Sequence, residues 1–168
     1  MDYKEQARIW TKRLSTYHAP EAFSRVAQAS SEVPDSRFFN DSRFNPLREA
    51  WAAGQFAQAI QRRRNAEVLV RLEEGEFPDF VLKIGDRELP FEVTETMRPE
   101  RKRGKEYKDR EKDPLLLTPY RPAEGEQEGP SWIGESVRKK HEKSYGPKPH
   151  LLVYHSAERK QHGHRPDR

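Results

Sequence analysis

Two carboxylates in the middle of the chain, Asp79 and Glu92, have the type and spacing that could carry chemistry. They lie near the ends of residues 78–95, PDFVLKIGDRELPFEVTE, where both halves alternate between apolar and polar side chains, as two strands would. Gly85 and Asp86, between the halves, are typical of a two-residue hairpin turn. Counting outward from this turn places Asp79 directly opposite Glu92. Like charges facing each other at roughly 5 Å between Cβ atoms destabilise a sheet, and a divalent metal ion would satisfy both.

The alternation also predicts which face of this hairpin is buried, because successive side chains of a strand point to opposite faces. One face is expected to carry Phe80, Leu82, Ile84, Leu89, Phe91 and Val93. The other is expected to carry Asp79, Val81, Lys83, Glu88, Glu92 and Thr94. The first face should therefore pack on the core, and the second should hold the acids.

The composition suits one domain with a modest core. The 168 residues include 33% hydrophobic and 36% charged residues and 13 prolines, so we expect part of the chain to be poorly ordered. A net charge of +4 is weak support for a polyanionic partner, since 28 acids accompany 32 bases. Without cysteine, disulfides and thiolate metal sites are excluded. No apolar run predicts a membrane span or a signal peptide, so a soluble cytoplasmic protein without a membrane partner is expected.

The elements around the hairpin suggest an α/β core with a helical arm before it. Residues 1–45 are expected to form the N-terminal helical arm and a loop. A helix should begin at Asn45 and Pro46, an N-cap followed by proline, and continue through the arginines at 62–64. Residues 67–73 alternate and predict a strand, which completes a three-stranded antiparallel meander with the hairpin.

The C-terminal part predicts a further helix and strand. Residues 98–112 are densely basic and plausibly helical, and residues 121–130 are expected to be a flexible insertion. Ser131 can cap a helix with Ile133, Val137 and His141 on one face. The apolar run 150–155 then predicts a buried strand parallel to a neighbour. The core should therefore span residues 46–156, followed by a disordered basic tail at 157–168.

Pro78-Asp79 followed by Glu92-Val93-Thr94 resembles the motif of the PD-(D/E)xK nuclease superfamily, and the element order over residues 46–156 is similar to its restriction-endonuclease-like core. The resemblance implies a Mg²⁺-dependent nuclease acting on DNA, with Mn²⁺ as an alternative cofactor. It also implies that Asp79, Glu92 and the Val93 carbonyl bind the metal. By analogy with enzymes of this fold that cut both strands, a homodimer is a further expectation.

Thr94 stands where the family has a lysine that helps to orient or activate water, and three interpretations stay open. The lysine could come from Lys102 or Lys105 on the following basic helix, with Lys140 behind them. The metal alone could orient and activate the water, assisted by Thr94 or Glu95. Alternatively, the site has lost catalysis and the fold is a nucleic-acid-binding or protein-interaction module.

Two further sets of residues complete the prediction. Glu49 would complete a metal site, although a carboxylate in the first turn of a helix is equally explained by the helix dipole. The basic residues expected to contact nucleic acid are Arg101, Lys102, Arg103, Lys105 and Lys140. For these cations a solvated surface is the alternative. Other enzyme classes are disfavoured, because the chain has no Gly-rich phosphate loop, HExxH helix or G-x-S-x-G elbow.

Overall fold

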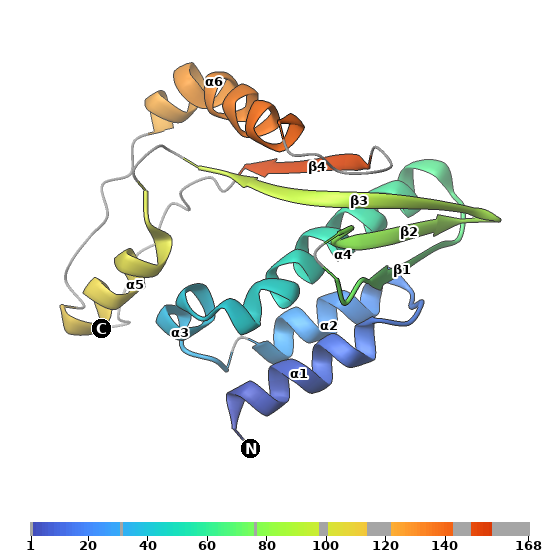
Figure 1. The fold of residues 1–168 in the computed structure, drawn as a ribbon, viewed down its shortest axis with the longest axis horizontal. Helices are drawn as coiled ribbons and strands as arrows, with labels where there is room; N and C mark the ends of the chain where they lie inside the picture. The colour runs from blue at the N-terminus through green and yellow to red at the C-terminus, as the bar shows by residue number, and fades with distance from the viewer. Residues whose placement is uncertain are drawn as a thin grey trace, which may run out of the picture.

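The protein has a mixed α/β fold with a four-stranded sheet between helices (Figure 1). The computed structural model describes residues 2–30, 32–75, 77–97, 101–113, 122–142 and 149–155. Its helices are α1 (Tyr3–Leu14), α2 (Pro20–Ser30), α3 (Asp35–Asn40), the 3₁₀ helix η1 (Ser42–Phe44), α4 (Asn45–Arg64), α5 (Arg103–Lys112) and α6 (Pro122–His141). Its strands are β1 (Val68–Leu72), β2 (Phe80–Ile84), β3 (Arg87–Thr96) and β4 (His150–His155). The predicted order of helix, three-stranded meander, helix and strand is confirmed.

The sheet has the order β1-β2-β3-β4, with the first three strands antiparallel and β4 parallel to β3. The predicted parallel strand is therefore confirmed. Helix α4 covers one face together with α1 and α2, whereas α6 lies over the other (Figure 1). Of the described helices, not one is long and apolar enough to cross a membrane.

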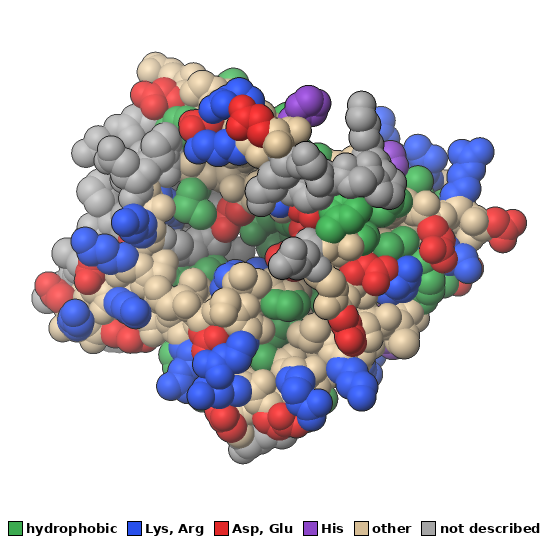
Figure 2. All heavy atoms as spheres, viewed as in Figure 1, with side chains coloured by type: hydrophobic (Ala, Val, Ile, Leu, Met, Phe, Trp, Pro, Cys, Tyr) green, Lys and Arg blue, Asp and Glu red, His purple; other side chains and the backbone are tan. Residues whose placement is uncertain are grey.

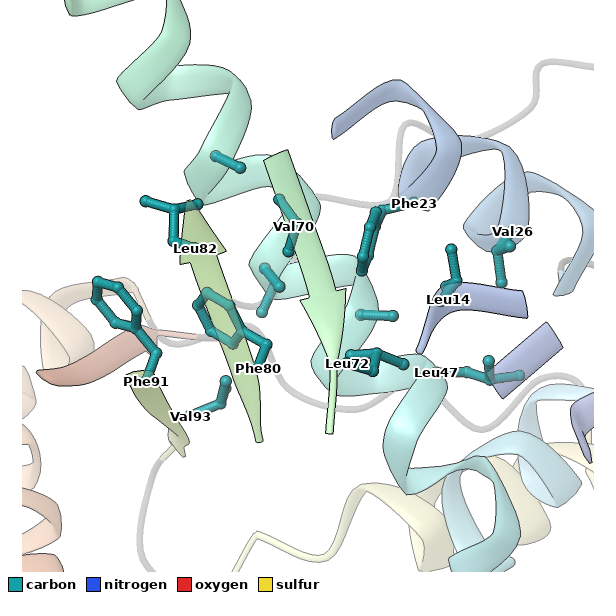
Figure 3. Close-up of a cluster of buried hydrophobic side chains, with 14 of the residues drawn as sticks. Leu14, Phe23, Val26, Leu47, Val70, Leu72, Phe80, Leu82, Phe91 and Val93 are labelled. Carbon is teal, nitrogen blue, oxygen red and sulfur yellow. The ribbon is translucent and has the colours of Figure 1, made fainter. Parts of the chain in front are cut away.

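The hairpin register is the predicted one. Ile84 pairs with Arg87 and Phe80 pairs with Phe91. Gly85 begins the turn with a φ of +57°, a conformation that side chains with a Cβ rarely adopt. The predicted apolar face packs into the core, as the close-up shows for Phe80 and Phe91 (Figure 3), whose rings stack at 4.9 Å between centroids.

Helices α1 and α2 lie at the predicted positions, but they do not form a peripheral arm. Leu14, Phe23 and Val26 belong to the same buried cluster as Leu47 and Val70 (Figure 3). The segment between the two helices also joins the sheet edge, since the amides and carbonyls of His18 and Val70 exchange hydrogen bonds of 2.9 Å. An arm was expected because amphipathic spacing shows that a helix has an apolar face without showing what covers it.

The segment expected as a loop before α4 instead forms α3 and η1. Helix α4 itself agrees with the prediction, although Asn45 is its first residue and Phe44 occupies the capping position. At its C-terminus, Asn65 adopts the left-handed conformation that commonly ends a helix.

Helix α6 begins at Pro122, so most of the expected flexible insertion at 121–130 is helical. Proline is favoured in a first helical turn, and the acids of this segment suit a helix N-terminus, which outweighs its two glycines. The face that Ile133 and Val137 share is not the inward one, because both residues are 38% exposed. Trp132, which is buried, faces inward instead. The expected tail at 157–168 lies outside the described residues.

Helices α2 and α4 pack closely at Gly54, which gives a prediction about stability. A Cβ at this position would lie 2.6 Å from the Phe23 Cβ, an atom that cannot move without its helix. Gly54→Ala should therefore lower the free energy of unfolding by about 1–2 kcal/mol, measured by urea denaturation, despite the better helix propensity of alanine.

Gly134→Ala is the matched control, because nothing lies within 4 Å of a Cβ added on this part of α6. This variant should gain up to about 1 kcal/mol from helix propensity. A stabilising effect of equal size in Gly54→Ala would contradict the close packing of α2 on α4.

Candidate functional site

Asp79 is positioned by the end of the β2–β3 pairing. Its backbone N–H donates to the Phe91 carbonyl at 3.0 Å, and its Oδ2 accepts from the Val93 N–H at 2.6 Å. Asp79 lies just before β2, and its side chain thus accepts the hydrogen bond of a β3 amide. This contact holds the Asp79 carboxylate beside β3, where it interacts electrostatically with Glu92.

Glu92 points to the opposite face from the core and lies beneath α6. Only 2% of the residue is exposed, and the Lys140 ammonium contacts its Oε2 at 2.5 Å. A nearly buried carboxylate needs a hydrogen-bonded cation or a proton. The helix supplies the cation because Trp132, Ser136 and Lys140 recur every four residues, which puts them on the inward face.

Glu49, in the first turns of α4, belongs electrostatically to the same group. Burial, and then the charges of Asp79 and Glu92, raise its pKa to about 7, while Arg48 and Lys140 act in the opposite direction. The site thus takes its acids from α4, from the start of β2 and from β3.

Asp79 is perturbed in the same direction. Burial raises its pKa most, and Glu92 adds to this, although the Val93 N–H and the Lys140 charge partly oppose the shift. Burial is the main cause of both raised pKa values and the neighbouring acids add to it, so the site favours the neutral forms of Asp79 and Glu49.

The donor set has the chemistry of a hard-cation site, since carboxylate and carbonyl oxygens are the ligands that Mg²⁺ prefers. The Val93 carbonyl faces the same strand edge as its N–H, toward Asp79, because both groups of one strand residue point to the same neighbour. Within the described ranges, no three Asp, Glu, His or Cys side chains are grouped so that they could hold a metal ion. A cation at this site would therefore require the oxygens to move from the positions that the structure shows.

The other predicted catalytic residues lie in different places. Thr94 is half-buried on the Glu92 face and is paired in register with Val153 of β4. Lys102 and Lys105 are exposed at the start of α5. The structure therefore brings Lys140 to the acids rather than Lys102 or Lys105.

The predicted nucleic-acid contacts also separate. Arg101 is only 12% exposed at its side chain, and its Nε donates to Glu106 at 2.9 Å. The side chain of Arg103 lies outside the described set. Lys140 is engaged with Glu92, so Lys102 and Lys105 are the members of this set with described, exposed side chains.

Comparisons of the chain with protein-family models, with curated proteins and with solved structures find no match. The function must therefore be inferred from the chemistry of this site. Its most informative contact, between Lys140 and Glu92, was only a secondary choice from sequence. The four-residue spacing of Trp132, Ser136 and Lys140 puts these residues on one side of α6, but it is not an amphipathic pattern and would not have identified the contact.

The Lys140–Glu92 contact predicts a large effect on stability. Lys140→Met leaves the nearly buried Glu92 charge without its cation and should lower the free energy of unfolding by about 3 kcal/mol at pH 7 in EDTA. Adding Glu92→Gln to this variant should recover most of the loss, because no buried charge remains. Urea denaturation measures both.

Lys139→Met is the matched control, since Lys139 pairs with Glu135 on the exposed side of the same helix. Its effect should stay within about 0.5 kcal/mol. Equal losses in the two single variants would mean that the Glu92 ion pair has no special role in stability.

The raised pKa of Glu49 predicts a pH-dependent stability. With a folded pKa of about 7 and an ordinary value of 4.5, the contribution of this group is fully present below 4.5 and is lost as pH rises through 7. Glu49→Gln removes this loss, so the variant should gain stability relative to the wild type at pH 8 but not at pH 4.5. Urea midpoints at the two pH values, in EDTA, test this.

Glu21→Gln serves as the control, because Glu21 is an exposed acid in the first turn of α2. Losing its dipole interaction should cost about 0.3–1 kcal/mol at pH 8. If Glu49→Gln likewise loses stability at pH 8, Glu49 acts only on the helix dipole.

Proposed function

We propose that this protein is a metal-dependent nuclease with a restriction-endonuclease-like core that hydrolyses phosphodiester bonds of DNA. The observation that carries the proposal is the placement of Asp79 opposite Glu92 with the Lys140 ammonium against Glu92. Two acids and a lysine are thereby gathered at one place, although the lysine comes from α6 and not from the strand. The sequence resemblance to PD-(D/E)xK nucleases supports the same chemistry.

Asp79, Glu92 and the Val93 carbonyl would hold Mg²⁺ or Mn²⁺, with Glu49 beside them. When bound, the metal supplies Lewis acidity toward phosphate and lowers the pKa of a coordinated water. The Val93 N–H holds Asp79 in position, which keeps the two acids together before substrate arrives.

Lys140 takes the place of the motif lysine in this proposal. Its ammonium donates to Glu92 and would also stabilise negative charge on the phosphate oxygens. Glu49, with a pKa of about 7, is the carboxyl best suited to accept a proton from the attacking water near neutral pH. Thr94, on the Glu92 face, could hydrogen-bond that water.

A non-catalytic nucleic-acid-binding module is the second candidate, and one observation favours it. Lys140 already neutralises Glu92 without a metal, which is what a site that has lost catalysis would need in order to stay folded. In this case the acids and Lys140 would be structural, and binding to DNA would not require Mg²⁺. The homodimer remains a prediction by analogy in both cases.

Cleavage assays separate the two functions. Supercoiled plasmid and single-stranded DNA are incubated with the protein in Mg²⁺ or Mn²⁺. The wild type should cut, whereas Asp79→Asn and Glu92→Gln should cut at least about 100-fold more slowly and Lys140→Gln about 10–100-fold more slowly.

Glu88→Gln is the matched control, because Glu88 is an exposed acid on the same strand and face as Glu92. It should cut like the wild type. Equal cleavage by all variants would indicate a contaminating nuclease and would remove the support for the proposal. DNA binding without cleavage in any metal would favour the non-catalytic module.

A further inference from the structure

Helix α5 and its N-cap residue carry four exposed lysines along one side, called here the lysine stripe. Three- and four-residue steps bring its members onto neighbouring positions of the helix surface. They are Lys102, Lys105, Lys108 and Lys112. Over the part of the surface where Figure 1 places α5, Figure 2 shows Lys and Arg side chains interspersed with Asp and Glu. The stripe runs about 15 Å at a rise of 1.5 Å per residue.

Two acids of the helix have other hydrogen-bond partners. Glu106 accepts from Arg101, and Glu111 accepts from the Ser36 hydroxyl. Asp109 lies among the lysines and offsets part of their charge. Over the described ranges, none of the four lysine ammoniums forms an ion pair. The stripe is therefore a row of cations with an incomplete set of counter-charges.

The opposite side of α5 is anchored to α3. Tyr107 stacks on Phe39 with 4.9 Å between ring centroids, and the Asn40 amide donates to the Gly104 carbonyl at 2.9 Å. Gly104 allows this approach, because a Cβ there would meet the end of the Asn40 side chain, which would have to move. The anchor fixes the rotation of the helix, so the stripe faces solvent in one orientation.

We infer that the lysine stripe of α5 is a docking surface for the phosphate backbone of duplex DNA. The inference rests on the proposed function, and it names the surface that holds the substrate of that site. A duplex presents one charge per about 1.7 Å, hence about nine charges along a 15 Å helix. Four flexible ammoniums at this spacing contact phosphates without reading sequence. This set adds Lys108 and Lys112 to the residues predicted from sequence and omits Arg101, which is engaged with Glu106.

An anionic membrane is the less favourable partner for the same charges. A helix that lies in a bilayer interface needs an apolar face to insert. On α5 that face would be built on Tyr107, which already packs against Phe39. The observations therefore favour a polyanion in solution.

Fluorescence anisotropy with a fluorescein-labelled 20-bp duplex, in EDTA over a range of salt, tests the inference. The triple variant Lys105→Gln/Lys108→Gln/Lys112→Gln should bind at least about 10-fold more weakly at low salt. The slope of log K against log salt should be smaller in magnitude by about 2.7, or 0.9 for each lost phosphate contact. A urea unfolding curve confirms that the variant is folded.

The matched control is Arg62→Gln/Arg63→Gln/Arg64→Gln, which removes the same charge from the exposed end of α4. It should change the slope by less than about 1. If the two triple variants weaken DNA binding equally, net charge alone explains the binding and the inference is overturned. Preferential binding to phosphatidylserine vesicles over DNA, lost in the stripe variant, would overturn it as well.

The same measurements separate this inference from the proposed function. Binding is measured in EDTA, so it does not depend on cleavage. If the protein binds DNA through the stripe but never cuts it, the inference is supported and the proposed nuclease activity is contradicted. Conversely, a protein that cuts with Asp79 and Glu92 but binds DNA equally well without the stripe would keep the nuclease and remove the inference.

Discussion

The nearly buried carboxylate of Glu92 is the constraint on which the arrangement of the molecule around the sheet depends. A charge that is 2% exposed is tolerated only with a cation in contact, and Lys140 of α6 is that cation. The contact sets the rotation of α6, because the side that carries Lys140 must face the sheet, and Trp132 is buried on that side as a consequence. Ile133 and Val137 are left half-exposed although they are more apolar than Lys140.

The acid pair depends on the hairpin register. A slip of one residue would move Glu92 into the core and Phe91 onto the α6 face, because side chains alternate along a strand. Gly85 at the turn and the stacked rings of Phe80 and Phe91 oppose such a slip. Asp79 adds to the register from beyond the end of β2, since its side chain accepts the Val93 amide.

Local patterns predicted the parts of the fold that are determined locally. The hairpin, its register, the opposition of Asp79 and Glu92, the span of α4 and the parallel β4 all followed from alternation, turn residues and helix caps. The errors arose where tertiary packing determines which helix faces are buried and where a helix begins. Spacing in α1 and α2 shows apolar faces but not their burial against α4, and the composition of 121–130 obscured a helix that the sheet supports.

The position of Lys140 shows the same limit of prediction from local sequence patterns more clearly. Thr94 directed attention to Lys102 and Lys105, which are close in sequence to the strand, whereas the contact is made by Lys140, 48 residues after Glu92. Only the path of the chain through α6 and into β4 brings this lysine over the acid. A four-residue stripe that mixes tryptophan, serine and lysine has no amphipathic signature, so no sequence period would have ranked it first.

The protein contacts that hold the two acids use one oxygen of each. Asp79 is held through Oδ2 by the Val93 amide, and Glu92 is held through Oε2 by Lys140. A carboxylate has two oxygens and about four lone-pair positions, so one contact on each acid does not exhaust its capacity to accept. The anchoring contacts therefore do not use up the lone pairs of the two acids, while burial, reinforced by the neighbouring acids, raises the pKa values of Asp79 and Glu49 and favours their neutral forms.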